Sequence, residues 1–298
     1  MDRARYLGLM LRRRRRSTSG WLVLTALEDN CRFLLQAYGS PAEIELDVSS
    51  DGGATYTTST FAPPSSVSSV TSVSKTYVLA EGLVSGQSVM LRGDNEDFSL
   101  ESSSSFNIGN NWRLDGSKKF SVSGNLMALL DRSGRSVTIA RDYMLHHLFW
   151  SETYLVDASQ LSLPATMLAS CSYLRMFYGC TALVLPPRCL PDVPDVSSLG
   201  KFAYRGMFEG CTSLERSPRI ANSIPVEDFV ASSWAPFFYT FKGCTSLREM
   251  EVSFAGWGNI IYQWVSGVPE GGTFIKPATL PTKYGINYIP SGWTVIDK

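Results

Sequence analysis

Met207-Phe-Glu-Gly-Cys-Thr-Ser-Leu214 is a phrase that the chain repeats, and this repetition decides the fold. Near-copies are Met176-Phe-Tyr-Gly-Cys-Thr-Ala-Leu183 and Thr240-Phe-Lys-Gly-Cys-Thr-Ser-Leu247, so the phrase recurs with a nearly constant period. A fixed period in this range is typical of a solenoid, in which each unit buries its apolar face only when a neighbour stacks on it. Solenoids present extended surfaces, so the repeat favours recognition over catalysis.

Each position of the phrase has an expected structural role. The recurring Phe fills the interior, Gly permits a turn that other residues resist, and the final Leu begins a buried strand. The structural repeat positions are therefore expected to be Phe177, Cys180, Leu183, Phe208, Cys211, Leu214, Phe241, Cys244 and Leu247.

Three of the six Cys lie at the same position of the phrase and are expected to form a ladder of buried, unbridged thiols, because Cys is small and readily buried. Disulfides between adjacent rungs, or metal binding, remain the alternatives. Zinc sites use closely spaced Cys pairs, which Cys positions one whole repeat apart do not provide. No metal site and no cofactor are predicted.

Residues 124–298 are expected to form the solenoid. Leu148-Phe-Trp-Ser-Glu-Thr-Tyr-Leu155 lies almost one period before the first clear copy and is interpreted as a degenerate first unit. Each unit is expected to contain a short helix, over 169–177 and 202–208, before the Gly-Cys-Thr turn. Residues 256–298 are expected to close the array as a cap.

Residues 21–123 are expected to form a small antiparallel β-sandwich, because short apolar runs alternate with Gly-rich turns. The fold class is therefore mainly β with short helices. The expected strands are 22–27, 32–36, 43–48, 77–79, 87–92, 105–108 and 119–122.

The charge is concentrated at the N-terminus. Residues 1–16 hold seven Arg and one Asp, a net charge of +6, so that the rest of this neutral chain carries −6. The run Arg12, Arg13, Arg14, Arg15 and Arg16, in an arm over residues 1–20, is expected to anchor the chain to a partner protein. A disordered tail is the alternative. Nucleic-acid binding is not expected, because the remainder is acidic.

No apolar run approaches the length of a membrane helix, so membrane insertion is not expected. The run Trp21-Leu-Val-Leu-Thr-Ala-Leu27 is only seven residues long, ends in Glu28-Asp29 and lacks a small-residue cleavage site, so no cleaved signal peptide is expected.

The phrase Met-Phe-x-Gly-Cys-Thr-Ser-Leu, preceded by Leu163-Pro-Ala-Thr-Met-Leu-Ala169, resembles BspA-like leucine-rich repeats, which occur in surface proteins of bacteroidete gut bacteria. The resemblance covers about residues 140–298. It implies a non-enzymatic, adhesin-like role and no fixed catalytic residues. Secreted members begin with an export signal, whereas the Arg-rich start and the domain order here resemble virion proteins of phages or prophages of these bacteria.

Aromatic residues of the repeat region exceed what the phrase requires, and Tyr and Trp are favoured at interfaces. The third position of the phrase varies (Trp150, Tyr178, Glu209 and Lys242) and is expected to be exposed. The candidate ligand surface comprises Trp150, Tyr178, Tyr204, Trp234, Tyr239 and Trp264. Packing within the core or caps is the alternative for each ring.

A catalytic role is not expected. The only histidines, His146 and His147, have no Cys or carboxylate four residues after them, and no Gly-x-Ser-x-Gly turn is present. The sequence therefore predicts a non-enzymatic phage virion protein of fibre or decoration type. Its expected partners are other virion proteins, a host cell-surface protein or glycan, and further copies of itself. The alternative is a bacterial cell-surface adhesin.

Overall fold

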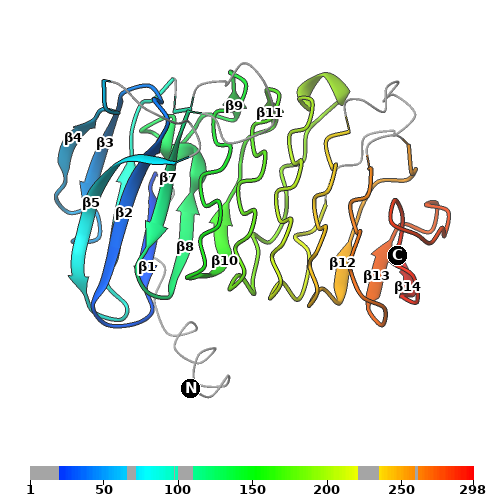
Figure 1. Cartoon of the computed structure of the whole chain (residues 1–298). Helices are drawn as coiled ribbons and strands as arrows, with labels where there is room; N and C mark the ends of the chain where they lie inside the picture. The colour runs from blue at the N-terminus through cyan, green and yellow to red at the C-terminus, as the bar shows by residue number, and fades with distance from the viewer. Residues whose placement is uncertain (1–19, 66–71, 97, 100–109, 221–234, 259–260) are drawn as a thin grey trace.

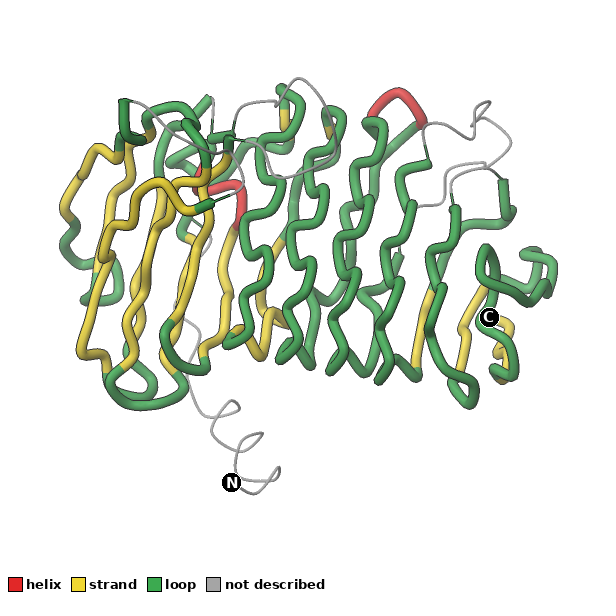
Figure 2. Tube along the Cα trace, in the orientation of Figure 1, coloured by secondary structure: helices red, strands yellow, loops and turns green. Residues whose placement is uncertain are grey.

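The computed structural model describes residues 20–65, 72–96, 98–99, 110–220, 235–258 and 261–298 (Figure 1). The expectation of a mainly β chain is confirmed. In these ranges the helical structure is limited to two short 3₁₀ turns, η1 (Leu126–Leu129) and η2 (Val196–Ser198) (Figure 2).

A six-stranded sheet contains most of the N-terminal strands, in the order β10-β8-β1-β6-β3-β4. Its neighbours are antiparallel except β8 and β10, which run parallel. The strands are β1 (Leu22–Ala26), β3 (Ile44–Ser49), β4 (Thr57–Phe61), β6 (Ser88–Arg92), β8 (Phe120–Asn125) and β10 (Leu155–Ser162).

A second, antiparallel sheet has the order β5-β2-β7, with β2 (Cys31–Tyr38) between β5 (Val73–Leu83) and β7 (Asn111–Gly116). The two sheets pack against each other through aromatic rings. Phe33 of β2 lies edge-on to Phe120 of β8 with ring centroids 5.3 Å apart, and Tyr77 of β5 lies edge-on to Phe61 of β4 at 5.1 Å. Such pairs are the favoured edge-to-face geometry.

Strands β4 and β7 lie outside the runs that the sequence predicted, and the predicted strand at 105–108 falls outside the described residues. The sequence of β4, Thr-Thr-Ser-Thr-Phe, carries one apolar residue, so it has no alternating apolar pattern to detect.

The remaining chain forms a stack of repeats. Five turn segments, 143–152, 171–180, 202–211, 235–244 and 261–268, lie side by side and are numbered 1 to 5 in chain order. Phe149 of segment 1 stacks on Phe177 of segment 2, in the register that the degenerate first phrase indicated. The interval from segment 4 to segment 5 is shorter than the earlier ones, since Gly267 lies against Gly243.

The expected helices at 169–177 and 202–208 are wrong, because these residues form runs of successive turns. In segment 2 the backbone has positive φ at every fourth residue, at Cys171 (58°), Arg175 (51°) and Gly179 (70°). A left-handed residue at each fourth position interrupts helical geometry. The apolar period of roughly four looks helical in the sequence, but it belongs to these turns.

In the turn segments, the backbone N–H groups form hydrogen bonds to two kinds of acceptor in alternation. In segment 2, alternate residues donate their N–H groups to carbonyls of segment 3 and of the residue before it, with N···O distances of 2.8–2.9 Å; the donors are Cys171, Tyr173, Arg175, Phe177 and Gly179. The intervening residues donate to the carbonyl three residues earlier, as Met176 does to Tyr173 (3.2 Å). Buried backbone groups are therefore paired without a helix or a regular strand.

Identical side chains stack inside these segments. The Phe149, Phe177, Phe208 and Phe241 rings form a column with centroids 5.3, 5.3 and 5.7 Å apart and nearly parallel planes. The nine structural repeat positions predicted from the phrase all have 0% exposed surface.

The repeat thiols are buried and unbridged, as predicted. Cys180, Cys211 and Cys244 are free, and each thiol donates to the carbonyl of a Phe in the preceding segment at 2.9–3.1 Å. Burial raises the pKa of all three well above the ordinary value, so they stay protonated donors. A thiol fits here because it is small, and because an S–H group is only a weak donor, its burial demands little from the carbonyl that accepts it.

The opposite side of the stack carries short parallel strands. Strand β12 (Glu249–Glu251) pairs with β13 (Thr273–Lys276), which pairs with β14 (Thr294–Asp297). A separate pair joins β9 (Thr138–Ile139) to β11 (Met167–Leu168). Isolated bridges such as Asp157↔Leu185 and Arg216↔Glu249 link the intervening repeats.

The N-terminal sheets continue directly into the stack. Strand β8 pairs with β10, and the Leu114 N–H of β7 donates to the Leu148 carbonyl of segment 1 at 2.8 Å. The domain boundary expected between residues 123 and 124 falls within β8. One hydrophobic cluster extends from Leu22 to Trp293, so both parts share a core.

None of the helices in the described part of the chain is long and apolar enough to cross a membrane.

Candidate functional site

The outward side chains of the turn segments form a surface, here called the turn face. Its first column holds the varying third position of the phrase, Trp150, Tyr178, Glu209 and Lys242, and all four are partly exposed. Lys242 pairs with Glu209 at 3.0 Å. The backbone of the segments repeats while these side chains differ, so the order of aromatic and charged groups on the turn face is specific to this chain.

Aromatic rings and cations alternate on the turn face. Trp150 and Tyr178 lie 6.1 Å apart, the Arg205 guanidinium lies 4.4 Å from the Phe238 ring centroid, and Lys242 Nζ lies 4.3 Å from that of Tyr239. Cations over ring faces are mutually stabilising and hold both groups in fixed positions. The face is therefore suited to a ligand that offers flat apolar faces together with negative charge.

The structure divides the six aromatic candidates. Trp150, Tyr178 and Tyr239 lie together on the turn face and are partly exposed. The prediction of ligand contact is wrong for Tyr204 and Trp264, because both side chains are fully buried. The Tyr204 ring stacks between Tyr173 and Phe237 at 5.9 and 5.1 Å, and the Trp264 indole N–H donates to the Tyr288 carbonyl at 2.8 Å.

Two further predictions lie outside the described residues. They are the candidate contact Trp234 and the anchoring run Arg12 to Arg16.

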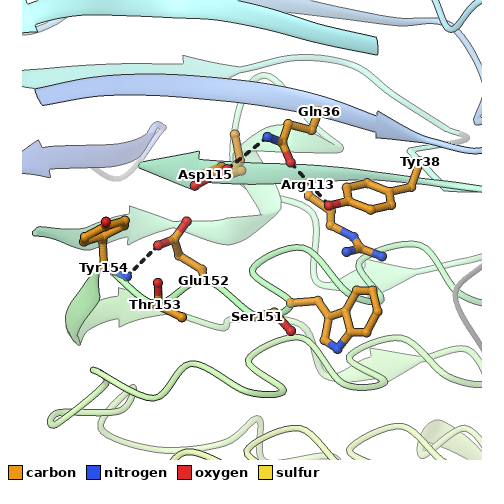
Figure 3. A pocket seen from close by; sticks show the side chains of 10 residues that line it. Gln36, Tyr38, Arg113, Asp115, Ser151, Glu152, Thr153 and Tyr154 are labelled. Atoms are coloured by element: carbon orange, nitrogen blue, oxygen red, sulfur yellow. Dashed lines mark hydrogen bonds between the residues drawn. The ribbon is translucent and has the colours of Figure 1, made fainter. Parts of the chain in front are cut away.

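A pocket of about 420 Å³ opens where β2 and β7 meet segment 1 and the residues after it (Figure 3). It is called the junction pocket. Its lining includes Tyr38, Arg113, Asp115, Trp150, Glu152 and Tyr154. Of these residues, only Trp150 is among the ligand contacts predicted from the sequence. The lining residues come from three separate stretches of the chain.

Arg113 is clamped at one end of the junction pocket. Its guanidinium carbon lies 3.3 Å from the Tyr38 ring centroid and 3.9 Å from that of Trp150. The Arg113 side chain is buried, and its Nε and Nη2 have no hydrogen-bond partner. Burial lowers the pKa of Arg113 to about 9, so the group remains a cation at neutral pH.

Glu152 lies at the other end and occupies the position that Cys holds in the later repeats. Its Oε2 accepts from the Gly116 N–H (3.0 Å) and its Oε1 from the Tyr154 N–H (2.6 Å). Burial raises the pKa of Glu152, and a hydrogen bond to Asp115 together with the charge of that carboxylate raises it further. Glu152 is therefore protonated at neutral pH.

Asp115 is also held from the far side, because it accepts from the Gln36 amide at 2.9 Å. The junction pocket thus has a cation at one end and two hydrogen-bonded carboxyl groups at the other, with aromatic rings beside both (Figure 3).

His146 and His147 are packed beneath Arg113 as neutral rings. Burial lowers the pKa of His146 to about 4 and that of His147 well below the ordinary value, and the Arg113 charge adds to both shifts. Both ring nitrogens of His147 lack a hydrogen-bond partner. As neutral rings, the two histidines add no further positive charge beside Arg113.

We expect Glu152→Gln to flatten the fall of stability with alkaline pH. Glu152 has a folded pKa of about 9, above its unfolded value, so folding takes up a proton between the two pKa values. Its contribution to stability is therefore full at low pH and decreases towards pH 9, by up to about 1.4 kcal/mol per pH unit. Urea unfolding of both proteins at pH 7.0 to 8.5 measures the difference. Equal slopes would show that Glu152 is ionised in the folded protein.

In the described part of the chain, no group of three or more His, Cys, Asp or Glu side chains is placed to hold a metal ion. Comparisons with models of known families, with curated proteins and with solved structures find no match to this chain.

Proposed function

We propose that the protein is a non-enzymatic virion component, of fibre or decoration type, that attaches a phage to its host. In this proposal the repeat stack is a BspA-like leucine-rich-repeat solenoid and the turn face is its ligand surface. The N-terminal region docks to other virion proteins, and copies of the chain associate with one another on the particle.

The observation that carries this proposal is the contrast between the two sides of each turn segment. The inward columns repeat the same residue, as with Phe177, Phe208 and Phe241, whereas the outward column changes from Trp150 to Tyr178, Glu209 and Lys242. A scaffold with a repeated core and a varied surface is suited to presenting specific side chains to a ligand. Partly exposed aromatic and cationic side chains are the types that dominate binding energy at interfaces.

Location is tested by mass spectrometry of gradient-purified phage particles, beside an outer-membrane fraction of the host. The proposal predicts the chain in the particles, with peptides from residues 1–20 intact. Recovery only from the membrane fraction, trimmed at the N-terminus, would replace the virion role with that of a cellular adhesin.

Attachment is tested on the turn face itself. Tyr262 of segment 5 is exposed, and its ring centroid lies 6.4 Å from that of Tyr239 of segment 4. The double change Tyr239→Ala and Tyr262→Ala should weaken binding of the purified protein to host cells about tenfold or more, because two aromatic anchors are removed. The matched control is Glu249→Ala, an exposed side chain on the opposite, sheet side. Binding measured by flow cytometry that is equally weak, or equally strong, in both variants would reject the turn face as the ligand surface.

A further inference from the structure

Several buried polar atoms in and beside the junction pocket have no hydrogen-bond partner. These buried atoms are Nε and Nη2 of Arg113, both ring nitrogens of His147, and Nε1 of Trp150. Arg113 and Trp150 line the pocket, and His147 packs on Trp150 with ring centroids 5.5 Å apart. The Arg113 and Trp150 atoms are donors, so what this end of the pocket lacks is an acceptor.

The orphaned edge of Arg113 has a specific shape. Nε and Nη2 form one side of the planar guanidinium, and their two parallel N–H bonds match the two oxygens of a carboxylate. A buried cation without an anion is costly, and native proteins pair such groups. The geometry therefore calls for a carboxylate in the plane of the guanidinium, between the Tyr38 and Trp150 rings.

Arg92 shows how this fold treats an Arg that has a purely structural role. Its guanidinium also lies between a Trp and a Tyr, 4.1 Å from the Trp21 ring centroid and 4.9 Å from that of Tyr56. There the chain supplies the carboxylate itself, because Arg92 Nε donates to Asp47 Oδ2 at 2.9 Å. At Arg113 the same aromatic clamp is present, but no carboxylate of the described residues pairs with it.

The rest of the junction pocket indicates what carries the missing carboxylate. Asp115 and Glu152 lie at the far end, where a carboxylate accepts hydrogen bonds from hydroxyl groups. Tyr154 and Trp150 offer ring faces for stacking, and Ser151 and Thr153 add small polar groups. A volume of about 420 Å³ suits a sugar ring rather than a small inorganic anion.

We propose that the junction pocket binds a carboxylated sugar residue, with its carboxylate on Arg113 and its hydroxyl groups towards Asp115 and Glu152. This rests on the proposed attachment function and assigns its ligand class. The sugar is either a uronic acid of a bacterial polysaccharide or a sialic acid of a mucin-type glycan. The Trp150 ring lies over the face of the guanidinium, 3.9 Å from its carbon, and the carboxylate binds at the edge.

The turn face continues the same chemistry beyond the pocket. Trp150 lies 6.1 Å from Tyr178, whose ring is approached by Arg175 at 5.2 Å, and Arg205 and Lys242 follow on the later segments. An acidic saccharide chain anchored in the junction pocket can therefore extend along alternating rings and cations.

The test measures binding of defined sugars to the full chain by isothermal titration calorimetry. The probes are a galacturonate trisaccharide, its methyl ester, sialyllactose and lactose. We expect binding of one or both acidic sugars, at least tenfold weaker binding of the ester, and no binding of lactose. The galacturonate and sialyl arms distinguish the two sources. Equal affinity for the acid and its ester, or affinity for none of the four, would overturn the proposal, and so would tighter binding of glycine or of an acidic peptide.

Two variants separate binding from folding. Arg113→Met should abolish sugar binding and leave thermal stability equal or higher, because an uncompensated buried charge is replaced by an apolar side chain of similar length. Arg113→Lys keeps the charge but loses the two-pronged edge, so binding should weaken at least tenfold. Glu249→Ala, an exposed position on the sheet side of the stack, is the control and should retain full affinity for the acidic sugars. Unchanged binding in both Arg113 variants would reject the site.

The same variants distinguish this inference from the attachment function. If Arg113→Met still binds host cells like the wild type, while Tyr239→Ala with Tyr262→Ala does not, the attachment function stands and the sugar assignment fails. If the unaltered protein binds acidic sugars but not host cells, the sugar assignment stands and the attachment function fails.

Discussion

Phe208→Ala should lower the free energy of unfolding by about 3–5 kcal/mol, the usual cost of removing a buried aromatic ring. The Phe208 ring lies in the middle of the Phe column and has a parallel neighbour on each side, Phe177 at 5.3 Å and Phe241 at 5.7 Å. Turns on both sides hold the backbone, so the cavity cannot collapse. Urea unfolding followed by circular dichroism measures the loss.

The matched control is Phe238→Ala, the same change at a partly exposed position of the neighbouring segment. It should cost less than half as much, because less apolar surface is buried. The Phe208 variant should also unfold less cooperatively, because each repeat is stabilised by its neighbours and the break lies mid-stack. Equal costs for the two variants would show that neither the deeper burial nor the stacking of Phe208 adds stability.

Asp47→Ala should destabilise the fold by about 3–5 kcal/mol, because it removes a fully buried carboxylate that two partly buried arginines share. The fully buried Asp47 carboxylate pairs with Arg92 (2.9 Å) and with Arg132 (3.1 Å), and it accepts from the Thr58 hydroxyl at 2.7 Å. The change therefore affects β3, β4, β6 and the chain after η1 together. Thermal and urea unfolding measure the effect.

Glu45→Ala is the internal control, since Glu45 also pairs with Arg132, at 2.8 Å, but its side chain is 53% exposed. An exposed pair contributes little, so we expect a loss below about 1 kcal/mol. A loss at Glu45 as large as that at Asp47 would mean that the Arg132 network, and not burial of the Asp47 charge, sets the cost.

The sequence predicts well where each repeat begins and which of its residues are buried, but it predicts the backbone conformation of the repeats poorly. Gly-Cys-Thr marks segments 2 to 4, and Phe149 in its degenerate phrase marks segment 1. Segment 5 carries Gly267 and Val268 without the Cys, so the motif does not mark it. The helix prediction fails for a physical reason. A turn that repeats every four residues spaces apolar side chains much as a helix does, and its left-handed residues include Cys171 and Arg175, not only glycines.

The junction pocket was beyond the reach of sequence reasoning because its parts meet only after folding. Arg113 comes from β7, Tyr38 from β2 and Glu152 from segment 1. One signal was available. Glu152 takes the place of a buried Cys in the repeat phrase, and a carboxyl at a core position indicates a polar partner nearby. In the same way, burial of Tyr204 and Trp264 depends on neighbouring segments that aromatic content alone does not reveal.

The bond from Leu114 to the Leu148 carbonyl and the pairing of β8 with β10 have a consequence for biosynthesis. The N-terminal sheets leave the ribosome first, and domains generally fold in that order. They then offer a finished edge, with backbone groups already aligned, to the first repeat as it emerges. Each completed repeat offers the same kind of edge to the next, so the stack can grow from one end in step with translation. The chain thus provides its own template, and no repeat has to nucleate alone in solution.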